Sequence, residues 1–378
     1  MTEISIAESR AVVVLGMHRS GTSVLTSGLG AVGVYLGDRL MPGKDDNPKG
    51  FFEDLDLTAI NLDLLAQLGC RWDSLRLADW RDLDTELQQQ YLKRAVEVVE
   101  HRFAGISLWG FKDPRVTRLM SFWDSVLALR GCRPVFVVAN RHPLSVAASL
   151  ARRDGMALAY ALLLWLLHQA EALRIVLDRG GLVVSYDGLM ECPREQLLRL
   201  ARFLGQESVL DMVRLAEFER EFLDETLRHS AFRRDGCDLE FDALGRMCKR
   251  LYLHLETWAA VEQPAHILQA EARDMLESLK QWLVDHASMI DVIDCSMRQS
   301  IQMRSEQIGL ARDSALVLAE RDRLKRQSRE FEQWCERLWC ELREWQNQAE
   351  MVVHQSGELR LRVCQAESRA LRLALMQR

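Results

Sequence analysis

The feature that most constrains the fold is an apolar run that ends in a glycine-bounded turn, within residues 11–30 (AVVVLGMHRSGTSVLTSGLG). The run is rich in valine and predicts a strand buried on both faces, as in a parallel sheet. Gly16 interrupts it, and after Gly21 apolar residues recur at helical spacing. A strand, such a turn and a helix form a cradle in which backbone N–H groups and the positive end of the helix converge. An anion such as phosphate satisfies these groups.

The turn fits the phosphate loop of nucleoside triphosphatases, G-x-x-x-x-G-K-[ST], except at the lysine. Thr22 stands where the lysine is expected, and the positive charge lies inside the loop at Arg19, beside His18. Without that lysine, the contact to the β- and γ-phosphates of ATP is missing. We therefore expect the loop to hold a phosphate, but not ATP with magnesium. An ordinary strand-to-helix turn is the alternative interpretation.

Composition argues against a nucleic-acid-binding protein, a disulfide-linked protein and a membrane-spanning protein. The chain has 378 residues, a length that is enough for one large α/β domain and something smaller, or for two domains. Its net charge is −6, and it has nine cysteines. The acidic balance argues against nucleic-acid binding. The cysteines form no C-x-x-C pair, so we expect neither a metal site nor a disulfide framework. The short polar N-terminus and the odd cysteine count indicate the cytoplasm. The longest apolar run, residues 156–167, is too short for a membrane span and predicts a buried helix.

Two later apolar segments also end in polar residues. Residues 135–139 predict a strand, followed by Arg141 and by a helix that carries Ser149. Residues 108–111 lead into K-D-P-R, which includes Asp113. Carboxyl ends of parallel strands meet at one edge of a sheet, where ligands bind in α/β folds. K-D-P-R therefore fits a ligand-binding loop, and equally a surface salt-bridge turn.

A resemblance to a known family follows from two of these segments. Residues 16–23 (GMHRSGTS) resemble the 5′-phosphosulfate loop of the PAPS-dependent sulfotransferases, usually P-[KR]-S-G-T-[TS], with Arg19 at the position of the catalytic Lys or Arg. Arg141, Pro143 and Ser149 match the family's R-x-P-x-x-x-x-x-S, which holds the 3′-phosphate. The resemblance implies that PAPS, and its product 3′,5′-ADP, contact the following residues. They are His18, Arg19, Ser20, Gly21, Thr22, Ser23, Arg141, Ser149, Tyr186 at the end of a further strand, and Arg228 in a late basic loop.

A glycine- and proline-rich loop at residues 35–50 leads to a candidate general base, Glu53. D-N-P-K-G-F-F-E, residues 46–53, resembles bacterial family members that modify glycans, which implies a carbohydrate hydroxyl as acceptor. In this interpretation Glu53 removes the hydroxyl proton, with Asp113 and His18 in reserve. Glu53 equally fits an acid at a helix N-terminus that interacts with the helix dipole, and both interpretations stay open.

A second glycine motif at residues 28–33 spells G-x-G-x-x-G, the dinucleotide fingerprint. That motif must directly follow a strand and open a helix. Here it lies at the far end of the helix that begins near Thr22. We interpret it as a helix C-terminus with close packing.

The composition changes after Pro264, the last proline. Apolar residues then recur at strict sevenfold spacing in one column, which begins with Met303, Leu310, Val317 and Leu324, whereas the companion column is ragged. This pattern predicts a long helix that pairs with another copy or docks on a partner protein. A solvated helix is the alternative.

The sequence as a whole predicts an α/β fold with a P-loop-like parallel sheet flanked by helices, and a long C-terminal helix. We expect a sulfotransferase domain over residues 1–260, a helical linker over 261–300 and a coiled-coil-like helix over 301–378. Two other functions stay open: a P-loop kinase that uses ATP, and a non-catalytic nucleotide-binding scaffold that recruits proteins through its tail.

Overall fold

The computed structural model describes residues 9–43, 49–76, 79–222, 232, 239–240, 242–262 and 264–376. The chain divides into two compact units, Met1–Met297 and Arg298–Arg378. The sheet and the predicted site lie in the first unit, and the second unit is helical.

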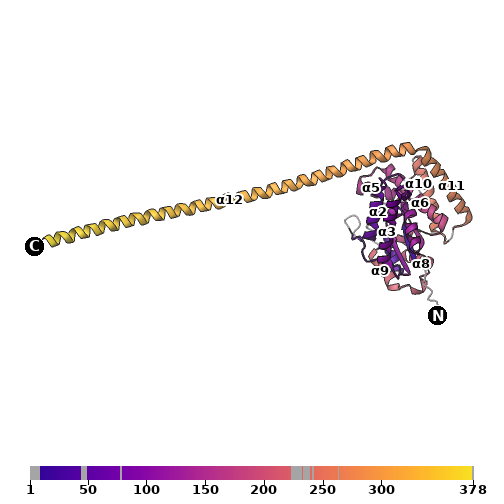
Figure 1. Ribbon diagram of the computed structural model, residues 1–378, viewed down its shortest axis with the longest axis horizontal. Coiled ribbons are helices and arrows are strands. Elements are labelled where there is room, and N and C mark those ends of the chain that lie inside the picture. Colours follow the sequence, from indigo (N-terminus) through magenta and orange to yellow (C-terminus); the bar gives the residue numbers. More distant parts are fainter. Residues whose placement is uncertain are drawn as a thin grey trace. The chain divides into compact units, whose positions relative to one another are not determined.

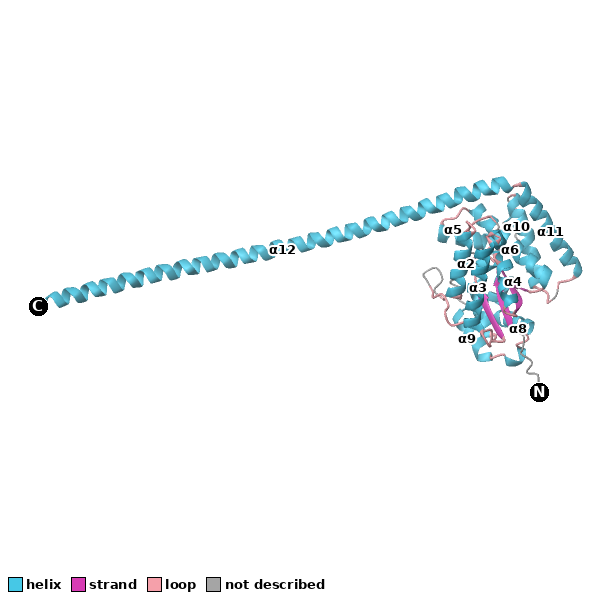
Figure 2. Cartoon of the chain, viewed as in Figure 1, coloured by secondary structure: helices cyan, strands magenta, loops and turns pink. Residues whose placement is uncertain are grey.

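The centre of the first unit is a parallel sheet whose described strands have the order β2-β1-β3-β4 (Figure 2, magenta). The strands are β1 at Arg10–Leu15, β2 at Leu108–Lys112, β3 at Arg133–Asn140 and β4 at Leu182–Ser185. In the register, Val14 pairs with Lys112 on one side and with Val137 on the other. Residues 11–15 are fully buried, as a continuous apolar run requires. The predicted parallel α/β sheet is confirmed.

Helices cover both faces of the sheet, because successive side chains of β1 point to opposite faces. Val13 and Leu15 join an apolar cluster with α2, α3, α4, α5, α6, α10 and α11, whereas Val12 and Val14 join a second cluster with α1, α8 and α9. The helices that follow β1, β2 and β3 are α1 (Thr22–Ala31), α2 (Leu55–Gln67), α3 (Thr85–Phe103), η2 (Pro114–Arg118), α4 (Met120–Leu129), α5 (Pro143–Asp154) and α6 (Leu158–Arg179). Those that follow β4 are α7 (Tyr186–Glu191), α8 (Pro193–Leu204), α9 (Met212–Phe222), α10 (Ala243–Ala259), α11 (His266–Asp285) and α12 (Ala287–Met376).

The strand order places a topological switch point at β1. The chain crosses from β1 to β2 on one side and then passes to β3 on the other side of β1. In open α/β sheets, ligands bind outside the carboxyl ends of the strands at such a point. The carboxyl ends here are Leu15, Lys112, Asn140 and Ser185, so the sheet brings the segments that follow them to one edge.

The second glycine motif lies in the last turns of α1. A Cβ atom on Gly28 would lie 2.8 Å from Cδ2 of Leu197, and one on Gly30 would lie 3.2 Å from Cδ1 of Leu36. Both glycines therefore permit close packing of α1. The interpretation of the motif as a helix C-terminus is confirmed.

Helix α6 is the core helix that the apolar run predicts. Within the described ranges it is the one helix long and apolar enough to cross a membrane, but 89% of its apolar window is buried inside the unit. Trp165 and His168 are both buried, with 0% and 1% exposure. Packing against the sheet and neighbouring helices accounts for its composition, and the cytoplasmic location stays a prediction.

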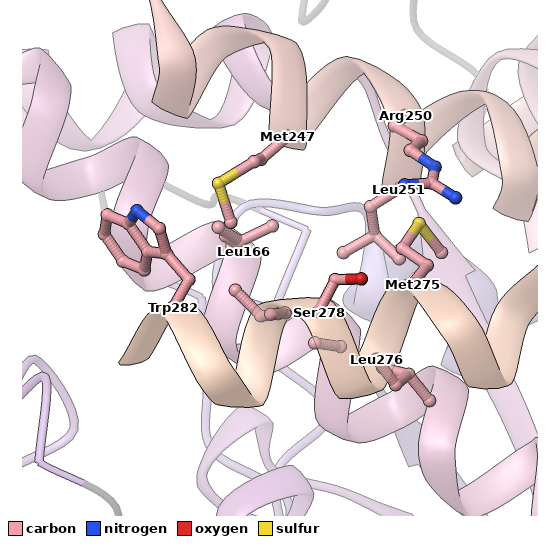
Figure 3. A pocket seen from close by; sticks show the side chains of 10 residues that line it. Leu166, Met247, Arg250, Leu251, Met275, Leu276, Ser278 and Trp282 are labelled. Atoms are coloured by element: carbon pink, nitrogen blue, oxygen red, sulfur yellow. The ribbon is translucent and has the colours of Figure 1, made fainter. Parts of the chain in front are cut away.

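Helices α10 and α11 extend the first unit beyond residue 260. Helix α11 buries Ala272, Met275 and Leu279 in the core. Together with α6 and α10 it encloses an apolar cavity of about 160 Å³ (Figure 3). The side chains that line this cavity are Leu166, Ala170, Met247, Arg250, Leu251, Met275, Leu276, Ser278, Leu279 and Trp282. The compact unit thus continues through the predicted linker to Met297.

The described residues of the second unit, 298–376, belong to the helix α12 (Figure 1). The first five members of the sevenfold column are more than half exposed. They are Met303, Leu310, Val317, Leu324 and Phe331. A helix this long with an apolar column is consistent with pairing, and coiled-coil formation stays a prediction.

A pH dependence of stability follows from His168. Burial lowers the pKa of this side chain to about 3, from an ordinary value of 6.5. The unfolded chain therefore binds more protons than the folded one between these values, so the free energy of unfolding falls as the pH decreases from 6.5 toward 3. We expect His168→Gln to reduce that slope by as much as about 1.4 kcal/mol per pH unit. Urea unfolding at pH 7 and pH 5 measures it.

The control for this prediction is His101→Gln, which removes an exposed imidazole from α3. The control should keep the wild-type slope. A His168→Gln protein with the wild-type slope would contradict the assignment of the slope to this buried ring.

Candidate functional site

The segment between β1 and α1, residues 16–21, has the backbone of an anion-binding loop. Gly16 and Gly21 have φ values of 136° and 86°, and Arg19 also lies in the left-handed region, at 70°. A Cβ atom on Gly16 would lie 2.9 Å from the carbonyl oxygen of Ala139 in β3, so only glycine allows this approach. Gly21 is the N-cap of α1 and, as a glycine, has no side chain with which to cap the helix. The first N–H groups of α1 therefore offer an anion site.

Thr117 ties the loop to η2, and Ser20 offers a buried hydroxyl inside the loop. The N–H of Gly16 donates to Oγ1 of Thr117 (3.0 Å), which ties the start of the loop to η2. Ser20 is fully buried, yet its Oγ has no hydrogen-bond partner among the described residues. Buried hydroxyl groups are normally hydrogen-bonded to protein, water or ligand. Such an atom inside the loop fits a phosphate oxygen as its missing partner.

The predicted 3′-phosphate residues lie against this loop. Arg141 follows β3, and its NH1 donates to the carbonyl oxygen of Arg19 (2.9 Å) across 122 positions of sequence. Nε of Arg19 donates in turn to Oγ of Ser149 on α5 (2.9 Å). The two predicted phosphate-binding segments thus meet at one edge of the sheet, where an arginine from each contacts the other.

Tyr186, directly after β4, packs beneath the loop. A Cβ atom on Gly21 would lie 2.3 Å from Cδ2 of the Tyr186 ring, so the ring and the glycine backbone are in close contact. The guanidinium of Arg141 lies 4.1 Å from the centroid of the same ring, as in a cation–π pair. Tyr186 therefore fixes both the loop and Arg141.

Glu53 is buried in an ion pair rather than placed at a helix end. Asp54 is the N-cap of α2, where its side chain accepts from the N–H groups of Asp56 and Leu57. Glu53 is 4% exposed, and its Oε1 accepts from Nζ of Lys112 (2.8 Å). Burial raises the pKa of Glu53, although the positive charge of Lys112 acts against this shift. The helix-end interpretation thus applies to Asp54, and Glu53 is a buried carboxylate paired with Lys112.

Lys112 links this carboxylate to the loop helix. Its Nζ donates also to Oγ of Ser23 (3.3 Å), in the first turn of α1. Ser23 donates to the carbonyl oxygen of Phe51 (3.2 Å). A cation from β2 therefore approaches the helix N-terminus, although the P-loop lysine itself is replaced by Thr22.

Asp113 holds the loop after β2 in place. Its carboxylate accepts from the N–H of Arg115 (3.0 Å), from NH1 of Arg115 (2.9 Å) and from Nδ2 of Asn61 (2.8 Å). Asp113 is 1% exposed and is the N-cap of η2. These contacts give Asp113 a positioning role and leave Glu53 as the better candidate base.

His18, the second reserve, is a neutral imidazole within the loop. Burial, together with the positive charges of Arg115 and Arg153, lowers its pKa well below the ordinary value. Its ring lies 4.6 Å from that of Trp72. Its Nε2 is buried with no hydrogen-bond partner within the part of the chain that the structure describes.

Sequence reasoning missed several residues that contact the predicted ones. Lys112 and Arg115 belong to the K-D-P-R segment at the end of a predicted strand. This position at the carboxyl edge of the sheet could have identified them as site residues. Thr117 and Trp72 carried no signal, because nothing in their local sequence indicates contact with residues 16–21. Arg228 lies outside the described residues, as do residues 44–48 of the loop before Glu53. Among the described residues, no three His, Cys, Asp or Glu side chains cluster as metal ligands do.

Comparisons with known proteins return solved structures with weak similarity to this chain. No family model matches the sequence, and no curated protein matches it. The sulfotransferase domain of the Synechococcus PCC 7002 olefin synthase is similar at 21% identity and a TM-score of 0.33, over 72% of this chain and 94% of that one. The sulfotransferase domain of the curacin biosynthetic pathway is similar at 18% identity and 0.34, over 72% and 98%. Similarity at this level assigns neither family nor activity.

A test of the loop packing uses Gly21. Gly21→Ala places a Cβ atom against Tyr186 in a backbone conformation that alanine disfavours. We expect a loss of about 2–4 kcal/mol in the free energy of unfolding, measured by urea unfolding. Gly131→Ala is the matched control, because Gly131 also has positive φ, at 63°, but nothing lies within 4 Å of its Cβ position. Equal losses for both variants would contradict close packing at Tyr186.

Proposed function

We propose that the chain is a PAPS-dependent sulfotransferase that transfers a sulfuryl group to a hydroxyl acceptor. The observation that carries the proposal is the contact between the two phosphate-binding segments, in which Arg141 binds the carbonyl oxygen of Arg19 and Arg19 binds Ser149. A nucleotide with phosphates at both the 5′ and 3′ positions needs two anion sites at one edge of a sheet. The family resemblance of both segments supports the same donor.

Each residue would have a defined task. Loop N–H groups of residues 20–23 and the Ser20 hydroxyl would hold the 5′-phosphosulfate, and Arg141 and Ser149 would hold the 3′-phosphate, since an arginine fork suits phosphate. When bound, PAPS supplies a sulfuryl group already activated by its phosphate leaving group. Arg19 would stabilise the negative charge that develops on the departing phosphate oxygen.

Proton removal from the acceptor would fall to Glu53. Its raised pKa makes the carboxylate a better proton acceptor than an exposed one. Lys112 contacts both Glu53 and Ser23, so it would orient the base and place a second positive charge beside the loop. No metal is required for these tasks.

The proposal also covers the acceptor, the cell compartment and the binding partner of α12. The resemblance of residues 46–53 to glycan-modifying enzymes supports a carbohydrate hydroxyl as the acceptor. The scattered, odd-numbered cysteines support a cytoplasmic location. The exposed apolar column of α12 supports assembly with another copy or with a partner protein.

One observation favours a second candidate function, a kinase that uses ATP. Nζ of Lys112 reaches Ser23 in the first turn of α1, so a lysine from β2 stands near the place left by Thr22. Competition between ATP and 3′,5′-ADP for the protein separates the two functions.

Arg141 tests the 3′-phosphate assignment. Arg141→Ala should weaken binding of 3′,5′-ADP by roughly 10- to 100-fold, the effect of one charge-assisted hydrogen-bonded pair, and should weaken 5′-AMP much less. Titration calorimetry with both nucleotides measures the difference. Arg152→Ala removes an exposed arginine from α5, the helix that follows Arg141, and controls for the change in charge.

One result for Arg141→Ala would contradict the 3′-phosphate assignment. Arg141 contacts the loop through the Arg19 carbonyl oxygen, so its loss can disturb the 5′ side. Equal weakening for both nucleotides would mean that Arg141 acts only through the loop, and the 3′-phosphate assignment would fail.

The pH profile tests Glu53 as the base. A base acts when deprotonated, so turnover should rise with pH through the raised pKa of Glu53, above its ordinary value of 4.5. Lys112→Ala removes a charge that lowers this pKa, so the acid limb should move to higher pH, whereas Lys112→Arg should leave it in place. Release of 3′,5′-ADP from PAPS, with a mixed oligosaccharide pool as acceptor, provides the assay.

Glu53→Gln completes this series. The variant should lose most turnover and the acid limb with it, because the amide cannot accept the proton. An unchanged limb in Glu53→Gln would remove Glu53 from the catalytic residues.

A further inference from the structure

A buried carboxylate at the start of α12 holds the segment beside the phosphate loop. Asp294, 2% exposed, accepts from the N–H of Leu75 (2.6 Å) and from the hydroxyl of Tyr160 (2.7 Å). The same hydroxyl oxygen lies 2.7 Å from the carbonyl oxygen of Asp73. Asp294 belongs to the first compact unit, and its helix continues into the second.

Arg118 holds the same segment from η2. Its guanidinium donates to the carbonyl oxygens of Ser74 and Leu75. Burial lowers the pKa of Arg118, and the negative charge of Asp294 acts against that shift. A buried charge is tolerated only with such partners, so Asp294 and residues 73–75 depend on each other for their placement.

The held segment reaches the phosphate loop through Trp72. The Trp72 ring lies 4.6 Å from the ring of His18, and the guanidinium of Arg153 lies 5.1 Å from the Trp72 centroid. His18 directly precedes Arg19 in the loop. A continuous set of contacts therefore runs from Asp294 through residues 73–75 and Trp72 to His18.

We propose that Asp294 is a positioning residue for the phosphate loop. It acts through Trp72 and His18, so the docking of the first turns of α12 sets the affinity of the loop for its nucleotide. The inference rests on the proposed function for its ligand, 3′,5′-ADP. It goes beyond that function because it makes a residue far along the chain, at the base of the tail helix, part of nucleotide binding.

The test compares Asp294→Ala with Asp291→Ala, an exposed aspartate on the same helix. We expect Asp294→Ala to weaken 3′,5′-ADP about tenfold in calorimetry, the loss of a charge-assisted hydrogen bond. Hydrogen exchange should become faster at the amides of residues 72–75 and 17–20. Asp291→Ala should change neither. Asp294→Asn, which keeps one acceptor oxygen, should restore most of the affinity.

Tyr160→Phe keeps the inference testable if Asp294→Ala does not fold, because it removes only the hydroxyl. It should produce a smaller change of the same kind. Wild-type affinity and wild-type exchange at residues 17–20, in a folded Asp294→Ala or Tyr160→Phe protein, would overturn the inference. A wild-type protein that does not bind 3′,5′-ADP would instead refute the proposed function, and exchange at residues 17–20 alone would then decide the role of Asp294.

Discussion

The pairing of β1 with both β2 and β3 is the constraint on which the site depends. This parallel register sets Leu15, Lys112 and Asn140 at one edge of the sheet. The residues that follow these strand ends then meet without any further adjustment of the chain. Gly16 allows the closest approach, because a Cβ atom there would lie 2.9 Å from the Ala139 carbonyl oxygen. The position of the site therefore follows from the sheet topology, and Gly16 and Gly21 permit the close contacts of its loop.

The second physical feature of the site is a buried pair of opposite charges, Lys112 and Glu53. Lys112 and Glu53 are 2% and 4% exposed, and a buried pair is held only when both partners keep their hydrogen bonds. The pair accordingly contributes little net stability, but it fixes a carboxylate and an ammonium beside the helix N-terminus. His18 stays neutral nearby because burial and neighbouring positive charges oppose its protonation. Shifted pKa values of this kind cluster at functional sites, which supports the proposed role of the loop and Glu53.

Much of the fold and part of the site could be predicted from local patterns. The valine run, the glycines and the periodic apolar residues identified β1, α1 and α6. The order of motifs placed Arg19 and Arg141 after strand ends and Ser149 on the helix that follows Arg141. Pairings between distant side chains carried no local signal. Sequence spacing could not show that Lys112 would contact Glu53, or that Asp54 rather than Glu53 would cap α2. The extent of the first unit beyond residue 260 could not be predicted for a similar reason, since α11 buries few residues in the core.

The most direct measurement is the thermal melting of the protein with 3′,5′-ADP, with 5′-AMP and ATP plus magnesium as comparators. A ligand that binds only the folded state stabilises it, by about 2.7 kcal/mol at 100 times its dissociation constant. Two anion sites predict a larger rise in melting temperature with 3′,5′-ADP than with either comparator. No rise with 3′,5′-ADP and a clear rise with ATP plus magnesium would contradict the account and assign the loop to a kinase.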